Sequence, residues 1–122
     1  MTAKRKTPLD RVRELCLALP ETTEKIAWGA PTWRVGGKLF VMFADHHHND
    51  GRLAIWCNAS DGAQEALVAA DPDVFFRPAY VGPSGWIGVQ LDKGLDWKVV
   101  KDLIAEAWKA SAPKKVLKNA AI

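Results

Sequence analysis

The sequence contains little of what marks a secreted, membrane-spanning or metal-dependent protein. Its 122 residues include only two cysteines and three histidines. No apolar run approaches the ~18 residues that a membrane-spanning helix needs, and the first residues lack the apolar segment of a secretion signal. We therefore expect a cytoplasmic protein with reduced thiols and no membrane partner.

The usual catalytic motifs are also missing. The sequence has no G-x-S-x-G, no phosphate-cradling glycine loop and no H-E-x-x-H. Cys16 and Cys57 fall on the apolar faces of their expected elements, where a thiol is a poor nucleophile. We expect no catalytic residue and no cofactor, and we favour a non-enzymatic protein.

The three histidines form one polar loop, Asp45-His46-His47-His48-Asn49-Asp50-Gly51. Imidazole and carboxylate groups do bind transition metals. A native site, however, usually draws its ligands from separate elements and supports them with further contacts. We therefore predict a solvated connection between two strands and no metal site.

The positive charge lies near the ends of the chain. There are 17 basic and 14 acidic residues, a net charge of +3, and removing six terminal lysines and arginines leaves 11 basic residues and a net charge of −3. The six residues are Lys4, Arg5, Lys6, Lys114, Lys115 and Lys118. Because basic tails give only weak, salt-sensitive attraction to phosphates, a specific contact must come from a local cluster in the body.

Hydrophobic periodicity predicts a helix, three or four strands, a second helix, two strands and a third helix. Thr7 and Pro8 open the first helix, and Asp61-Gly62-Ala63-Gln64 has the form of a capping box that begins the second. Asp96 caps the third helix. The order predicts a two-layer α+β fold with a mostly antiparallel sheet and helices mainly on one side.

Three stretches carry finer expectations. Residues 38–44 are apolar at both parities, so this strand is expected to be central, with Phe40, Met42 and Ala44 sharing a face. Residues 77–81 and 86–91 are expected to pair as a hairpin around the turn 82–85. We predict a single domain over residues 7–112, with basic tails at 1–6 and 113–122; the second tail should be mobile unless Val116 and Leu117 dock.

A family likeness is carried by Thr23–Lys38, Gly51–Cys57, Phe76–Gly82 and Gly85-Trp86-Ile87, in this order and spacing. With these stretches the sequence resembles the MmcQ/YjbR family over about residues 8–112. It implies an α-β3-α-β2-α layout, likened to secretion chaperones, and DNA binding. Some members carry Asn-Lys-x-His-Trp before the last strand, whereas this chain has Gly82-Pro83-Ser84-Gly85-Trp86 and so lacks the Lys and His.

Aromatic residues beside basic ones are the strongest lead to function. Six tryptophans are present; Trp97 and Trp108 lie on a helical core stripe, while the other four suit packing or binding equally. Arg52 has the parity of Trp56 and can flank the same patch. The candidate binding residues are Arg34, Lys38, Arg52, Trp56, Arg77, Tyr80 and Trp86.

These residues leave three functions open. Basic groups could meet phosphates while aromatic rings stack on bases, which predicts a nucleic-acid-binding module. A tryptophan-rich sheet in an acidic body instead favours a pocket for a small anionic or aromatic ligand, or an unrecognised enzyme. The chaperone-like layout points to a protein-interaction module, for which the sequence leaves the oligomeric state open.

Overall fold

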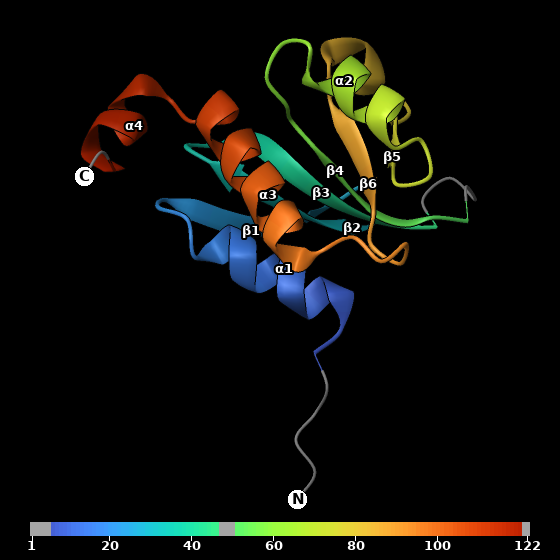
Figure 1. Ribbon diagram of the computed structural model, residues 1–122. Helices are drawn as coiled ribbons and strands as arrows, with labels where there is room; N and C mark the ends of the chain where they lie inside the picture. The colour runs from blue at the N-terminus through green and yellow to red at the C-terminus, as the bar shows by residue number, and fades with distance from the viewer. Residues whose placement is uncertain (1–5, 47–50, 121–122) are drawn as a thin grey trace, which may run out of the picture.

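The computed structural model describes residues 6–46 and 51–120. Its sheet has six strands in the order β1-β2-β3-β4-β6-β5, and every neighbouring pair is antiparallel. The α+β class and the antiparallel sheet are confirmed, and the structure adds a strand and a helix to the α-β3-α-β2-α layout (Figure 1). The elements are α1 (Pro8–Leu17), β1 (Thr22–Ala27), β2 (Ala30–Val35), β3 (Lys38–Asp45), β4 (Leu53–Cys57), α2 (Ala63–Ala70), β5 (Phe75–Phe76), η2 (Gly82–Ser84), β6 (Ile87–Gln90), α3 (Trp97–Ser111) and α4 (Lys114–Ala120).

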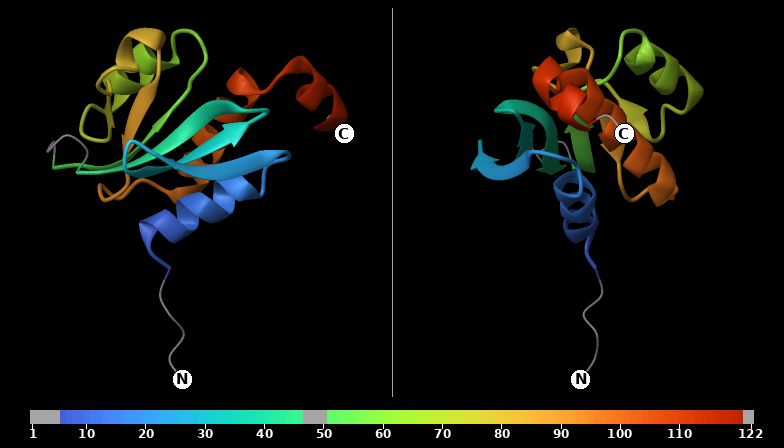
Figure 2. Two further views of the ribbon diagram at one scale, coloured as in Figure 1. Left: turned by 180° about the vertical axis from the view of Figure 1, so that it is seen from behind. Right: turned by 90° about the vertical axis from the view of Figure 1, so that its left-hand side faces the viewer.

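The helices pack on one face of the sheet. Helices α1 and α3 lie side by side there (Figure 1). In the view turned by 180°, the strands lie in front of α3 (Figure 2, left). All four helices contribute apolar side chains to one cluster on this face, here called the helix-side cluster; Val12, Ile104 and Val116 are among its buried members. Trp108 is buried in it and Trp97 packs against it, as expected for a core stripe.

A β-bulge divides the apolar residues of β3 between the two faces. Trp33 pairs with Val41 and Arg34 with Leu39, so Phe40 is an extra residue in β3. Phe40 and Val41 consequently both join the helix-side cluster. The expectation that Phe40 shares a face with Met42 is wrong, because one extra residue in a strand reverses the alternation beyond it.

Among the described residues, the opposite face carries no α-helix and has a smaller apolar cluster. Its buried members, which define the helix-free face, are Ala30, Met42, Ala44, Ala54, Trp56 and Phe76. Val81 and Trp86 pack on this cluster from the segment that follows β5. The two layers expected of the fold are therefore present, and a loop is the only cover that the described residues provide for part of the second face.

The predicted hairpin between residues 77–81 and 86–91 is mostly absent. Only Phe75 and Phe76 pair with β6 before the chain leaves the sheet. Pro78 has no N–H to donate to a strand ladder, and Tyr80 takes a left-handed conformation with φ 64°. The segment instead closes on itself through hydrogen bonds from Val81 N to Ala79 O (2.6 Å) and from Gly82 N to Pro78 O (2.9 Å).

Helix α4 is ordered by docking on the helix-side cluster. Residues 114–120, expected to belong to a mobile tail, form helix α4, and Val116 is buried in the helix-side cluster. Pro113 lies against the turn between β2 and β3, where a Cβ on Gly36 would come within 2.6 Å of its ring. Burial of Val116 therefore orders this segment, although most of its residues are polar.

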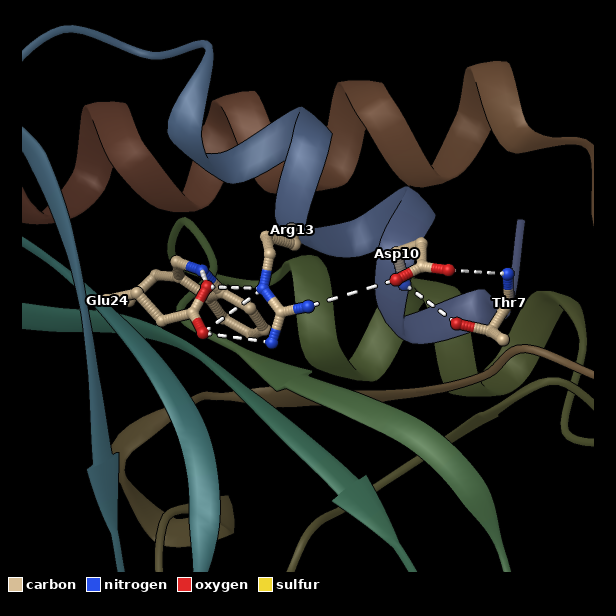
Figure 3. A network of polar contacts seen from close by, with 5 residues as sticks. Thr7, Asp10, Arg13 and Glu24 are labelled. Carbon is tan, nitrogen blue, oxygen red and sulfur yellow. Dashed lines mark hydrogen bonds and ion pairs between the residues drawn. The ribbon is translucent and has the colours of Figure 1, made fainter. Parts of the chain in front are cut away.

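The sequence predicts a Thr7 cap for α1 and a capping box for α2, and only the first prediction is confirmed. In α1, the Thr7 side chain accepts from Asp10 N while the Asp10 side chain accepts from Thr7 N (Figure 3). Helix α2 is capped by Gly62 at φ 82° without a side-chain hydrogen bond. The second reading is wrong because Gln64 is buried and uses its amide elsewhere.

An ion pair fastens α1 to the edge strand β1. Glu24 accepts from Arg13 Nε (2.9 Å) and Nη2 (3.0 Å), and also from the indole of Trp33 (2.9 Å) (Figure 3). The hydrogen bonds from Arg13 are the main reason that the pKa of Glu24 lies below its ordinary value, although partial burial opposes the shift. Three donors on one carboxylate hold helix, edge strand and core tryptophan together.

We predict that Glu24→Gln lowers the free energy of unfolding by about 1–2 kcal/mol at pH 7, since charged hydrogen bonds in a half-exposed site are lost. Because the folded state lowers the pKa of Glu24, its contribution is present above the ordinary glutamate pKa and is lost as the pH falls through the lowered value. Urea titrations of both proteins at pH 7 and at pH 3 measure this. Glu14→Gln, which removes an exposed pair with Lys6, is the control and should cost less than about 1 kcal/mol; a Glu24→Gln deficit that does not shrink at low pH would contradict the account.

Candidate functional site

A pocket of about 400 Å³ lies on the helix-free face. Its walls are almost entirely apolar and include three of the six tryptophans. The lining residues are Trp28, Leu39, Met42, Trp56, Tyr80, Val81 and Trp86. Four separate stretches of the chain supply them, so the pocket exists only in the folded protein.

Two central strands provide the floor. Met42 on β3 and Trp56 on β4 are direct partners in the register, and both side chains are buried. Leu39 reaches the same face because of the bulge in β3. The floor is therefore a rigid part of the sheet rather than a loop.

A glycine makes space beside this floor. Gly88 on β6 is the register partner of Trp56 on one side and of Phe76 on the other. A Cβ at residue 88 would overlap the ring of Phe76, so this ring lies directly over the glycine. The guanidinium of Arg52 in turn lies 4.0 Å from the centre of the Phe76 ring, a cation–π contact.

Residues 80–86 form one wall of the pocket, and helix α2 binds this segment through Gln64. The amide of Gln64 is buried, and its Nε2 donates to Gly82 O (2.8 Å) and to Trp86 O (2.5 Å). These carbonyls lie at the two ends of the η2 turn, so one side chain fixes both. Gln64 is therefore the link between helix α2 and the aromatic wall.

Trp28 stands at the rim because of an unusual turn. Trp28 and Gly29 connect β1 to β2, and both have positive φ, 52° and 74°. Two positive φ values are typical of the two-residue turn that suits a twisted hairpin, but they are uncommon for a bulky residue. The turn leaves the indole of Trp28 68% exposed, and Tyr80 across the pocket is 77% exposed.

The structure brings some of the predicted site residues together. Trp56, Tyr80 and Trp86 line the pocket. Arg52 lies on the same face as Trp56, as its parity indicated, because β4 pairs without a bulge. Arg34 does not itself line the pocket, but it is the register partner of the lining residue Leu39.

Two predicted residues lie elsewhere. Lys38 pairs with Val35, whose side chain is in the helix-side cluster, so Lys38 is on the opposite face from Arg34. Arg77 is exposed after β5 and does not line the pocket. The four cations do not form one basic patch, since the bulge separates Arg34 from Lys38.

Sequence reasoning did not select Trp28, Leu39, Met42 and Val81. Leu39 and Met42 appeared on opposite parities of an apolar strand, and the bulge that unites them has no clear signature. Val81 lay in a presumed strand. For Trp28, the sequence signal was its place directly before Gly29, which indicates a two-residue turn with an exposed side chain.

The other candidate chemistry is not assembled in the described residues. Burial raises the pKa of Cys16 above its ordinary range and that of Cys57 to about 12, so both thiols stay protonated. His46 Nδ1 accepts from Gly51 N (2.9 Å), while His47 and His48 lie outside the described residues. Residues 6–46 and 51–120 contain no group of three metal-ligating side chains. In the same ranges, no helix has both the length and the apolar character to cross a membrane.

The comparisons with known proteins establish the family. The YjbR family model matches residues 17–110. The chain belongs to the YjbR family. The crystal structure of Deinococcus radiodurans protein DR2400, which carries a DUF419 domain, is similar with a TM-score of 0.74 and 17% identity, over 91% of this chain and 86% of that one. At this identity the likeness shows only that the two proteins have the same fold. No curated protein matches the chain.

We predict that Gln64→Met loosens the aromatic wall without unfolding the sheet. Methionine has a similar shape and no donor, so the carbonyls of Gly82 and Trp86 both lose the bond from the Gln64 amide, while Gly82 O still accepts from Gly85 N (3.0 Å). The cost is about 1–3 kcal/mol at Trp86 O and less at Gly82 O. Hydrogen exchange should quicken at the amides of Gly82 and Trp86, which bond within the loop, while Val89 stays protected.

Gln90→Met is the matched control for this variant, because Gln90 donates to a single exposed carbonyl, that of Asp73. Loop exchange in the Gln90 variant should equal that of the wild type. If both variants exchange alike over residues 80–86, Gln64 does not hold the wall.

Proposed function

We propose that this YjbR protein is a non-enzymatic binding module that holds a flat aromatic group in the pocket of its helix-free face. The observation that carries the proposal is the pocket itself, with Trp28, Trp56, Tyr80 and Trp86 arranged around a largely apolar space of about 400 Å³. This volume falls within the ~300–1,000 Å³ of small-ligand sites. Indole and phenol rings favour flat partners through stacking and edge contacts.

The exposed rings support binding rather than packing. Buried aromatic side chains stabilise a core, but Trp28 and Tyr80 leave 68% and 77% of their surfaces in solvent at the mouth of an apolar pocket. Trp28 also adopts a backbone conformation that is costly for a bulky side chain. A ligand ring that covers them would remove this apolar surface from water.

The composition of the walls favours a binder over a catalyst. Of the seven lining residues, only Tyr80 has a titratable side chain. A pocket without a nucleophile, a paired base or a carboxylate offers little acid–base or covalent chemistry. The free, buried thiols of Cys16 and Cys57 suit a reducing compartment, so we place the protein in the cytoplasm.

The aromatic group could come from a free small molecule or from a base of single-stranded nucleic acid. We favour the small molecule, because Arg34, Lys38 and Arg77 do not follow one continuous path and the body outside the terminal basic segments has a net charge of −3. The nucleic-acid expectation has a specific support in Trp28 and Tyr80, whose exposed rings could each stack on a base.

Binding of the neutral dye N-phenyl-1-naphthylamine tests the pocket. We expect its fluorescence to rise on binding, and Trp28→Ala to weaken binding about fivefold or more, as stacking contacts are worth. Ile26→Ala is the control, since Ile26 is 62% exposed on the same hairpin but does not line the pocket. Equal affinities for the two variants and the wild type would exclude the pocket as the site.

Competition against the bound dye distinguishes a small-molecule ligand from a base of single-stranded nucleic acid. Displacement by mononucleotides and small aromatic compounds, with little dependence on salt, supports the small-ligand function. Displacement by single-stranded oligonucleotides alone, with affinity that falls steeply as salt increases, supports nucleic acid instead.

A further inference from the structure

Arg34 is a charged residue with an unmet hydrogen-bonding need beside the pocket. It lies in β2 and is half-buried. Its Nε is fully buried and, among the described residues, has no hydrogen-bond partner. A guanidinium presents five N–H donors and no acceptor, and an unpaired buried donor costs stability. Such an atom requires an explanation, and a missing ligand is one.

Strand alternation places Arg34 on the face of the pocket, and the bulge brings Leu39 opposite it. Trp33 and Val35 both lie in the helix-side cluster, so Arg34 between them faces the helix-free side, where the register shift makes Leu39 its partner. Leu39 lines the pocket, and side chains directly opposite each other on neighbouring strands lie within contact distance. Bulges commonly re-aim a side chain in this way next to functional sites.

No described carboxylate neutralises this guanidinium. Glu24 belongs to the adjacent strand, but it is already bound to Arg13 and to the Trp33 indole on the helix side. On β1 the register partner of Arg34 is Thr23, which carries no charge. Arg34 makes no ion pair within residues 6–46 and 51–120.

We infer that the ligand of the pocket is a planar aromatic acid, whose ring enters between the aromatic walls and whose acidic group is bound by Arg34. This inference rests on the proposed function and adds the charge of the ligand and the residue that recognises it. The planar guanidinium matches a carboxylate, sulfonate or phosphate oxygen pair with two parallel hydrogen bonds. An apolar pocket with one cation at its edge selects a molecule that is apolar at one end and anionic at the other.

Lys25, the register partner of Thr32, and Arg52 are also cations of this face. Lys25 is exposed, and the position of Arg52 differs from that of Arg34. Arg52 lies over Phe76, which is stacked on Gly88 beyond Trp56, whereas Arg34 borders the opposite side of the floor at Leu39. The two arginines therefore lie on either side of the central strands. Arg34 is the one whose buried donor has no described partner.

Two dyes that share one ring system and differ only in an acidic group measure how much that group contributes to binding. 1-Anilinonaphthalene-8-sulfonate carries a sulfonate, and N-phenyl-1-naphthylamine is the same skeleton without it. We expect the full-length protein to bind the sulfonate dye more tightly. Arg34→Met should weaken the sulfonate dye about tenfold or more, which corresponds to about 1.4 kcal/mol, and leave the neutral dye within twofold. Arg34→Lys should retain part of the preference, because it keeps the charge without the planar pair of donors.

Three variants serve as controls. Lys38→Met removes a neighbouring cation from the other face and should leave both affinities unchanged. Arg52→Met and Lys25→Met each remove another cation of the same face and should change the affinity for the sulfonate dye less than Arg34→Met does. The melting temperature of ligand-free Arg34→Met should match or exceed that of the wild type, because an unsatisfied buried donor is removed; this result shows that lost binding is not lost folding.

The possible failures can be told apart. If Arg34→Met keeps the wild-type preference for the sulfonate dye, or if Arg52→Met abolishes it instead, Arg34 is not the recognition residue and the pocket proposal still stands. If the wild type binds both dyes equally, the ligand is not selected for its charge. If it binds neither dye, the pocket is not a site for this ring system, and the inference about Arg34 fails with the proposed function.

Discussion

The β-bulge in β3 decides which residues of that strand reach each face of the sheet. One extra residue, Phe40, lets two consecutive side chains of β3 enter the helix-side core, and it reverses the alternation of Lys38 and Leu39 before it. Leu39 thereby reaches the helix-free face, opposite Arg34, while Lys38 leaves that face. The same local irregularity completes the core on one side and opens a site on the other.

Two of the seven residues that line the pocket have an uncommon backbone conformation. Trp28 and Tyr80 both have positive φ, and Gly88 gives up a side chain so that Phe76 can lie over it. Each feature is tolerated because a neighbour fixes it: a tight turn for Trp28, the loop hydrogen bonds and the Gln64 amide for the wall, and the Arg52 stack for Phe76. Local strain that surrounding contacts maintain is typical of binding sites.

The regular parts of the fold could be predicted from the sequence, and the irregular parts could not. Thr7 and Pro8 mark the first helix, and the alternation in β4 places Arg52 beside Trp56, because both follow from simple periodicities. The family and the α+β class are likewise confirmed. The bulge, the departure of residues 77–86 from the sheet and the docking of Val116 depend on tertiary contacts, so the pattern misplaced Lys38 and missed Leu39. The role of Gln64 could not be predicted either. Its spacing is that of a helix cap, but its buried amide donates to the carbonyls of Gly82 and Trp86.

The most direct test of the binding account is a nitrogen–proton correlation spectrum recorded while 1-anilinonaphthalene-8-sulfonate is added. The six indole N–H groups and the buried Nε–H of Arg34 report on both faces of the sheet at once. Binding in the pocket should shift the signals of Trp28, Trp56, Trp86 and Arg34, and leave those of Trp97 and Trp108, which belong to the helix side, unchanged. Shifts confined to Trp97 and Trp108, or an unchanged Arg34 resonance at saturation, would show that the dye does not bind in the pocket beside Arg34.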